Sequence, residues 1–124
     1  IKAYRIQEKA ANVGFDWEKR EDVWQKVKEE TAEVEAEINQ GSASDMEAEF
    51  GDLLFSIINA ARLYGINPEN ALERTNRKFI SRFNYVEAKA AEAGLKLKEM
   101  PLQQMDSLWN EAKNKSTDTE SHEK

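Results

Sequence analysis

The chain has 124 residues, a length typical of a single domain. It is 40% hydrophobic and 34% charged, with few Gly and Pro, which favours helices with charged outer faces. The net charge of −6 argues against nucleic-acid binding, and the absence of Cys excludes disulfides and thiolate metal sites. No membrane span or signal peptide is visible. We therefore expect a cytoplasmic protein, and the start at Ile1 rather than Met is compatible with a fragment of a longer one.

A first helix is predicted over residues 1–13, and Gly14 ends it. Phe15 and Trp17 follow, and we expect both aromatic side chains to fold onto the core, since large aromatics usually bury. Asp16 between them is the expected N-cap of the next helix.

The second helix is predicted over residues 18–40, with an apolar stripe that includes Val27 and Val34. Glu30 lies at the margin of this stripe, where a solvated charge is not expected. Glu33 lies one turn further along. An acid-rich helix explains the density of carboxylates here but not the position of Glu30.

A third helix is predicted over about 45–64, opened by a capping box of Ser44 and Glu47. Its apolar residues cover a wide arc. A narrow polar line interrupts that arc at spacings of i, i+3, i+7 and i+10, and its members are Glu49, Asp52, Ser56 and Asn59. Gly51, between the two acids, either allows close helix packing or leaves room for a ligand, and the sequence leaves both interpretations open.

The fourth helix is predicted over about 68–92, with Asn67 as N-cap and Pro68 at its first position. Along it, Arg74, Lys78 and Arg82 stack at i, i+4 and i+8, either as a solvated ridge or as a site for an anion. A last helix is predicted over 101–114. Residues 1–115 are expected to form the domain, and residues 116–124, with the only histidine, a disordered polar tail.

The acids form two pairs, each three residues apart, on helices joined by a short turn: Glu30 with Glu33, and Glu49 with Asp52. If the helices are antiparallel, the four carboxylates can converge on one point. Oxygen ligands without Cys or His favour Mg²⁺ or Mn²⁺ over zinc. Carboxylate-held Mg²⁺ together with stacked cations is a common way to bind phosphate esters. Composition alone also allows these acids to be merely solvated.

With these segments in view, the sequence resembles the MazG family of all-α nucleoside triphosphate pyrophosphohydrolases, specifically the C-terminal catalytic domain of a full-length MazG protein. The resemblance covers about residues 5–114. The matching residues are Gly14-Phe15-Asp16-Trp17, Lys26-Val27-Lys28-Glu29-Glu30, Glu33, Glu49-Phe50-Gly51-Asp52-Leu53-Leu54-Phe55, Asn59, Ala61, Arg62, Asn76-Arg77-Lys78-Phe79, Arg82-Phe83 and Trp109.

The resemblance implies a bundle of about five helices, assembled as a homodimer with helices of both subunits at each active site. It implies Mg²⁺-dependent hydrolysis of nucleoside triphosphates to the monophosphate and pyrophosphate, with broad base specificity. The implied metal ligands and catalytic acids are Glu30, Glu33, Glu49 and Asp52. The implied substrate contacts are Lys26, Glu29, Lys78, Arg82 and Trp109, the last against the nucleoside. Either Glu29 or Glu33 is a possible general base.

Some members of this family carry Lys where this chain has Asp45, so the resemblance implies one phosphate contact fewer in this chain. Two alternatives stay open at this point. The first keeps the fold but changes the substrate, as in dimeric dUTPases or phosphoribosyl-ATP pyrophosphatases. The second is a non-catalytic helical dimerisation module whose acids only solvate its faces.

Overall fold

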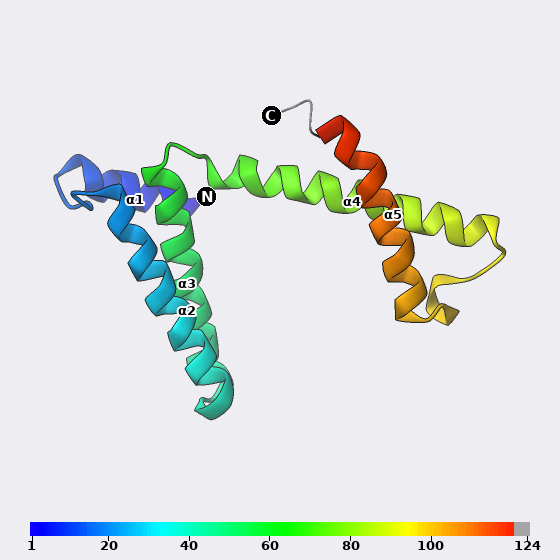
Figure 1. The fold of residues 1–124 in the computed structure, drawn as a ribbon. Coiled ribbons are helices and arrows are strands. Elements are labelled where there is room, and N and C mark those ends of the chain that lie inside the picture. Colours follow the sequence, from blue (N-terminus) through cyan, green and yellow to red (C-terminus); the bar gives the residue numbers. More distant parts are fainter. Residues whose placement is uncertain (121–124) are drawn as a thin grey trace. The chain divides into compact units, whose positions relative to one another are not determined.

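The computed structural model describes the backbone of residues 1–120 and the side chains of residues 1–115 (Figure 1). This part of the chain contains no strand, which confirms the predicted all-α class. Its elements in order are α1 (Lys2–Asn12), the 3-10 turn η1 (Arg20–Asp22), α2 (Val23–Gln40), α3 (Ala43–Leu63), α4 (Pro68–Glu92), the 3-10 turn η2 (Leu97–Glu99) and α5 (Leu102–Glu120). None of the described helices has the length and apolar character needed to cross a membrane.

Two predicted helix starts are wrong. The second α-helix begins at Val23 rather than 18, because Asp16 does not cap it: the Asp16 carboxylate accepts the Trp17 N–H and pairs with Arg62 instead. The third helix begins at Ala43, and its capping oxygen is Ser42 Oγ, which accepts the Asp45 N–H at 3.2 Å. Ser42 and Ser44 can both cap a helix, and the sequence pattern favoured Ser44, which lies two residues after the N-cap in the structure.

The start of the fourth helix is confirmed. Asn67 Oδ1 accepts the N–H groups of Glu69 and Asn70 at 2.9 and 3.1 Å, so Asn67 is the N-cap and Pro68 takes the first helical position. At the other end of the chain, α5 continues to Glu120, past the predicted end at 114. The last four residues of the predicted tail, including His122, lie outside the described residues.

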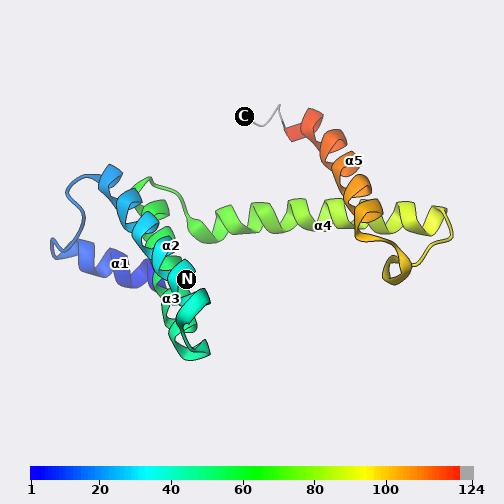
Figure 2. The same cartoon turned by 60° about the horizontal axis from the view of Figure 1, so that its bottom comes forward.

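The chain divides into two compact units, of which the first is Ile1–Ala71. Its centre is the hairpin of α2 and α3, joined by the short turn at 41–42, and α1 lies beside the C-terminal half of α3 (Figures 1 and 2). Val23 and Ala60 are fully or almost fully buried in this unit. The Trp24 indole N–H donates to the Tyr64 hydroxyl at 3.1 Å, which ties the start of α2 to the end of α3.

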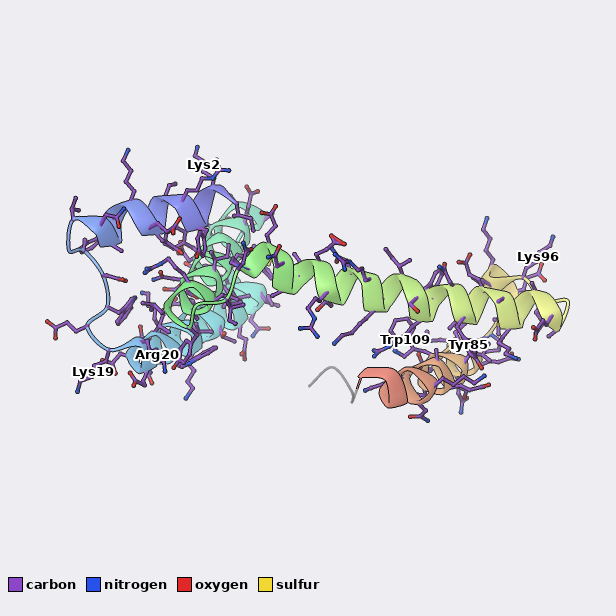
Figure 3. All side chains as sticks on the ribbon, turned by 90° about the horizontal axis from the view of Figure 1, so that it is seen from above. Lys2, Lys19, Arg20, Tyr85, Lys96 and Trp109 are labelled. Atoms are coloured by element: carbon purple, nitrogen blue, oxygen red, sulfur yellow. The ribbon has the colours of Figure 1, made fainter. Side chains whose placement is uncertain are left out.

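The second unit, from Leu72 onward, packs the rest of α4 against α5. Val86 and Ala90 of α4 and Ala112 of α5 are buried there. Tyr85 and Trp109 lie between the two helices in Figure 3. The Tyr85 hydroxyl donates to Glu111 Oε1 at 2.5 Å, which fixes α5 alongside α4.

Candidate functional site

Three of the four predicted acids come together on the α2–α3 hairpin. Carboxylate oxygens of Glu30, Glu49 and Asp52 all lie within 4.8 Å of one another. Glu30 comes from the middle of α2, and the other two come from successive turns of α3. The convergence follows from local structure, because a spacing of three residues puts Glu49 and Asp52 on one face of α3 and the short turn folds that face toward α2.

Glu30 is buried, with 8% of its surface exposed, although it carries a charge. The Lys26 ammonium, one helical turn earlier on α2, lies 2.8 Å from Glu30 Oε1. This ion pair, with a smaller contribution from the nearby Glu29 charge, raises the pKa of Lys26 above its usual value. Lys26 therefore supplies the positive charge that a buried carboxylate requires, while its own side chain stays half exposed.

The pKa of Glu49 is raised, first by partial desolvation and then by the neighbouring negative charges of Glu33, Asp52 and Glu30. Glu33 is thus close enough to Glu49 to repel it, although it does not belong to the group of three oxygens within 4.8 Å. Folding brings these carboxylates close together, and their mutual repulsion destabilises the folded chain. Such repulsion is relieved when a cation binds among the acids.

We expect Glu49→Gln to raise the melting temperature of the metal-free protein at neutral pH, because the amide removes one repelling charge. The pKa of Glu49 in the folded chain is raised, so the destabilisation by its charge is present above that pKa and disappears as the pH falls below 4.5, the ordinary pKa of a Glu side chain. The difference between wild type and variant should therefore vanish at about pH 4. Thermal denaturation in EDTA measures it. Glu47→Gln, the same change on an exposed residue of α3, is the matched control.

The donor set fits a hard divalent cation. Oxygens bound to one Mg²⁺ at its usual bond length lie at most about 4.2 Å apart, so only small side-chain rotations separate the described oxygens from a common ligand shell. No Cys or His lies among the three acids, which disfavours zinc. Gly51 leaves open space here: no described atom outside its own helix backbone and immediate neighbours lies within 4 Å of a Cβ added there. Packing within the described chain therefore does not explain this glycine.

Of the other predicted substrate contacts, Glu29 is exposed on α2, and the remaining three lie on the second unit. Trp109 of α5 packs against Phe79 with ring centroids 5.0 Å apart, and the Arg82 guanidinium lies 5.9 Å from the centroid of the indole ring. Lys78 is exposed on α4. This unit thus groups a cation and an aromatic ring on facing helices, as a nucleotide contact would need.

A cleft in the first unit was not predicted from the sequence. It has a volume of about 590 Å³ and lies between α1, the loop after α1 and the C-terminal half of α3. Phe15 lines it with 83% of its surface exposed, so the prediction that this ring folds onto the core is wrong; Trp17, at 38%, is also exposed. The only sequence signals for this region were the Gly14–Trp17 segment, Asn59 and Arg62. Gln7, which is buried at the cleft, gave none.

Comparison with known proteins places the chain in a family. Residues 18–87 match the MazG nucleotide pyrophosphohydrolase domain. The nucleoside triphosphate pyrophosphohydrolase/pyrophosphatase MazG of Thermotoga maritima is 43% identical over 111 residues, which are 90% of this chain and 42% of that protein. The nucleoside triphosphate pyrophosphohydrolase of Escherichia coli K12 is 40% identical over 120 residues, 95% of this chain and 46% of that protein.

A third relative, the uncharacterized protein YabN of Bacillus subtilis, is 55% identical over 69 residues, 56% of this chain and 14% of that protein. The chain spans less than half the length of each of these relatives. The matched domain covers more than half of the chain and contains all three converging carboxylates. This chain belongs to the MazG family.

Proposed function

We propose that the chain hydrolyses nucleoside triphosphates to the nucleoside monophosphate and pyrophosphate with the help of Mg²⁺. The single observation that carries the proposal is the convergence of Glu30, Glu49 and Asp52 within 4.8 Å in a chain of the MazG family. The names of the relatives from Thermotoga maritima and Escherichia coli, which refer to nucleoside triphosphate pyrophosphohydrolase activity, support the reaction.

Mg²⁺, or Mn²⁺ in its place, would be held by these three acids, with Glu33 as a fourth ligand. When bound, the cation would neutralise phosphate oxygens and lower the pKa of a coordinated water. Water attacks the α-phosphorus, the bond between the α-phosphorus and its bridging oxygen breaks, and pyrophosphate leaves. Glu29 or Glu33 would accept the proton of the water. This assignment is supported by the charge of Glu33 beside Glu49 and by the exposure of Glu29.

The cations of the chain would bind the phosphates. Once a metal ion neutralises Glu30, the Lys26 ammonium loses its main partner and is free to turn to a phosphate oxygen, because its side chain is 46% exposed. Lys78 and Arg82 would offset the charge of the leaving pyrophosphate. Trp109 would contact the nucleoside, and its packing beside Arg82 supports a cationic and aromatic surface for a nucleotide.

We also propose that the active form is a homodimer. Large apolar side chains stay exposed along α3, where Phe50, Leu54 and Ile57 recur at helical spacing with 47%, 58% and 45% of their surfaces exposed. A row of this kind on one helix is typical of a surface that a partner covers. Burying such rings and branched chains stabilises a complex by roughly 1.5–3 kcal/mol each when burial is complete.

The experiment is a substrate panel with product analysis. The protein is incubated with purine and pyrimidine ribo- and deoxyribonucleoside triphosphates, with and without Mg²⁺, and the phosphate products are separated. We expect pyrophosphate as the first product from several bases, only with a divalent cation. Orthophosphate as the first product contradicts the proposal. Turnover of dUTP alone, or of phosphoribosyl-ATP alone, assigns the narrower activities, and no turnover with no effect of Mg²⁺ on melting identifies a non-catalytic dimerisation module.

A further inference from the structure

The chain places a positive charge of its own at the group of three converging acids. The Lys26 ammonium lies 2.8 Å from Glu30 Oε1, and Glu30 is one of the three residues whose carboxylate oxygens lie within 4.8 Å of one another. The negative charge of Asp52, a second member of this group, also acts on the ammonium from the other helix of the hairpin. Lys26 therefore compensates part of the negative charge that a bound metal ion would compensate.

An ordinary surface ion pair does not account for this contact. Lys and Glu pairs at i, i+4 on an exposed helix face contribute little to stability, because water and salt screen them. Glu30 differs, since only 8% of its surface is exposed and screening is weak there. A buried carboxylate needs a positive partner in the folded chain. Lys26 is that partner as long as no metal ion is bound.

A divalent cation among the acids would compete with Lys26 for the charge of Glu30. Both are positive, and like charges a few ångströms apart repel strongly where a site is partly buried. Glu30 has a second carboxylate oxygen, so the two cations need not share one atom. They still share the charge of one carboxylate, and each therefore weakens the binding of the other.

The Lys26 side chain can move away from Glu30. It is 46% exposed, and a lysine has a flexible stem with three rotatable donors, so it can exchange partners while the backbone stays in place. Water is a weak replacement for a carboxylate, whereas an anionic phosphate oxygen accepts a charge-assisted hydrogen bond of comparable strength. A triphosphate bound beside the acids therefore favours the state in which Lys26 has left Glu30.

We propose that Lys26 is an internal counter-cation that competes with the divalent metal ion for Glu30, and that the triphosphate relieves this competition by binding the Lys26 ammonium. The inference rests on the proposed function, because the phosphate belongs to the substrate proposed for this site. Its consequence is coupled binding. Metal binds weakly without nucleotide, and through Lys26 each of the two ligands strengthens the binding of the other by the same factor.

The test measures binding of Mg²⁺ alone, without nucleotide, by isothermal titration calorimetry and by the Mg²⁺-induced rise in melting temperature. It compares wild type with Lys26→Met, which removes the charge, and with Lys26→Arg, which keeps the charge on a side chain that can hold a carboxylate with two hydrogen bonds. Lys28→Met is the matched control. Lys28 is exposed on the same helix and lies two residues from both Lys26 and Glu30, on another face.

We expect Lys26→Met to lower the Kd for Mg²⁺ about tenfold, the order of one charge-assisted hydrogen bond that no longer has to be broken. The metal-free variant should melt at a lower temperature than wild type, because Glu30 loses its partner, and should gain more from Mg²⁺ than wild type does. Lys26→Arg should raise the Kd several-fold, and Lys28→Met should change it by less than about twofold. With Mg²⁺ saturating, Lys26→Met should raise KM for ATP several-fold, the opposite of its effect on the metal.

A further readout uses the wild-type protein, so it does not depend on whether Lys26→Met folds. The Lys26 ammonium signal in proton–nitrogen NMR spectra at low temperature, assigned with Lys26→Arg, should shift when Mg²⁺ is added. If Lys26→Met does not fold, an unchanged Kd in Lys26→Arg together with an ammonium signal that does not shift overturns the inference.

A Kd for Mg²⁺ that is unchanged or raised in Lys26→Met overturns it as well, because Lys26 would then have no effect on the metal or would hold Glu30 in place for it. So does a Kd lowered equally in Lys28→Met, which would reflect overall charge rather than this contact. Failure of the proposed function looks different: wild type hydrolyses no triphosphate, while the Kd values for Mg²⁺ still follow the expected order.

Discussion

Asp52→Asn is expected to lower the rate of pyrophosphate release at saturating Mg²⁺ by at least about 100-fold, since loss of even an outer-shell partner of a metal ligand costs 10–100-fold. Asp52 contributes one of the three oxygens that lie within 4.8 Å, and an amide there offers a neutral ligand in place of a charged one. Glu30→Gln should act similarly and should also release Lys26 from its 2.8 Å ion pair. Steady-state kinetics with separated phosphate products measure both.

Metal binding provides a readout that does not depend on turnover. Mg²⁺ at about a hundred times its Kd should stabilise the wild-type fold by about 2.7 kcal/mol, and this gain should be lost in Asp52→Asn. Glu35→Gln, the same kind of change on an exposed acid of α2, should retain both activity and the Mg²⁺ effect. Full activity in Asp52→Asn, or a Mg²⁺ effect equal to that of wild type, would refute the assignment of this carboxylate to the metal.

The sequence predicted the acid cluster because its geometry is local. Two pairs at i, i+3 on consecutive helices need only a short turn to meet, and the structure brings Glu30, Glu49 and Asp52 together as that reasoning expects. The ion-pair partner of Glu30 also follows from local geometry, since Lys26 lies one turn away on the same helix. The spacing could not distinguish Glu33, which shares the helix face but lies outside the group of three oxygens.

The cleft could not be predicted because it depends on contacts between residues far apart in the sequence. The hydrogen bond from Gln7 to Phe55 spans 48 residues, and the pair of Asp16 and Arg62 spans 46. Asp16 before a helical pattern has the chemistry of an N-cap, and only the tertiary position of Arg62 decides that its carboxylate is used elsewhere. Helix identity is similarly local and was predicted well, whereas the helix starts at 23 and 43 depended on which of several candidate capping residues the fold uses.

Arg62→Met is expected to lower the free energy of unfolding at pH 7 by about 2 kcal/mol, the range for charged hydrogen bonds in a partly buried setting. The Arg62 side chain is 11% exposed, and its guanidinium joins two segments by binding Asp16 in the loop after α1 and Asn59 on α3. Methionine keeps the apolar stem but removes the guanidinium donor from Asn59 Oδ1 and from both carboxylate oxygens of Asp16, of which only Oδ1 still accepts the Trp17 N–H. Urea denaturation measures the change. Arg77→Met is the matched control, because Arg77 is 76% exposed and its 3.8 Å pair with Glu73 should contribute less than about 1 kcal/mol.

The pH dependence of this difference identifies its cause. The hydrogen bond from Arg62 holds the pKa of Asp16 below 3.8, the ordinary pKa of an Asp side chain. The pair therefore stabilises the fold fully above that value and loses this stabilisation as the pH falls through the lowered pKa of the folded chain. The gap between wild type and Arg62→Met should therefore be constant from pH 7 down to about pH 4 and should narrow below it. If the difference in unfolding free energy stays the same at low pH, Arg62 acts only through packing and through Asn59. If Arg77→Met lowers the unfolding free energy as much as Arg62→Met, the effect is not specific to the pair of Arg62 and Asp16. In the expected case the same ion pair holds the loop after α1 against α3, and with it the aromatic side chains of that loop that line the cleft.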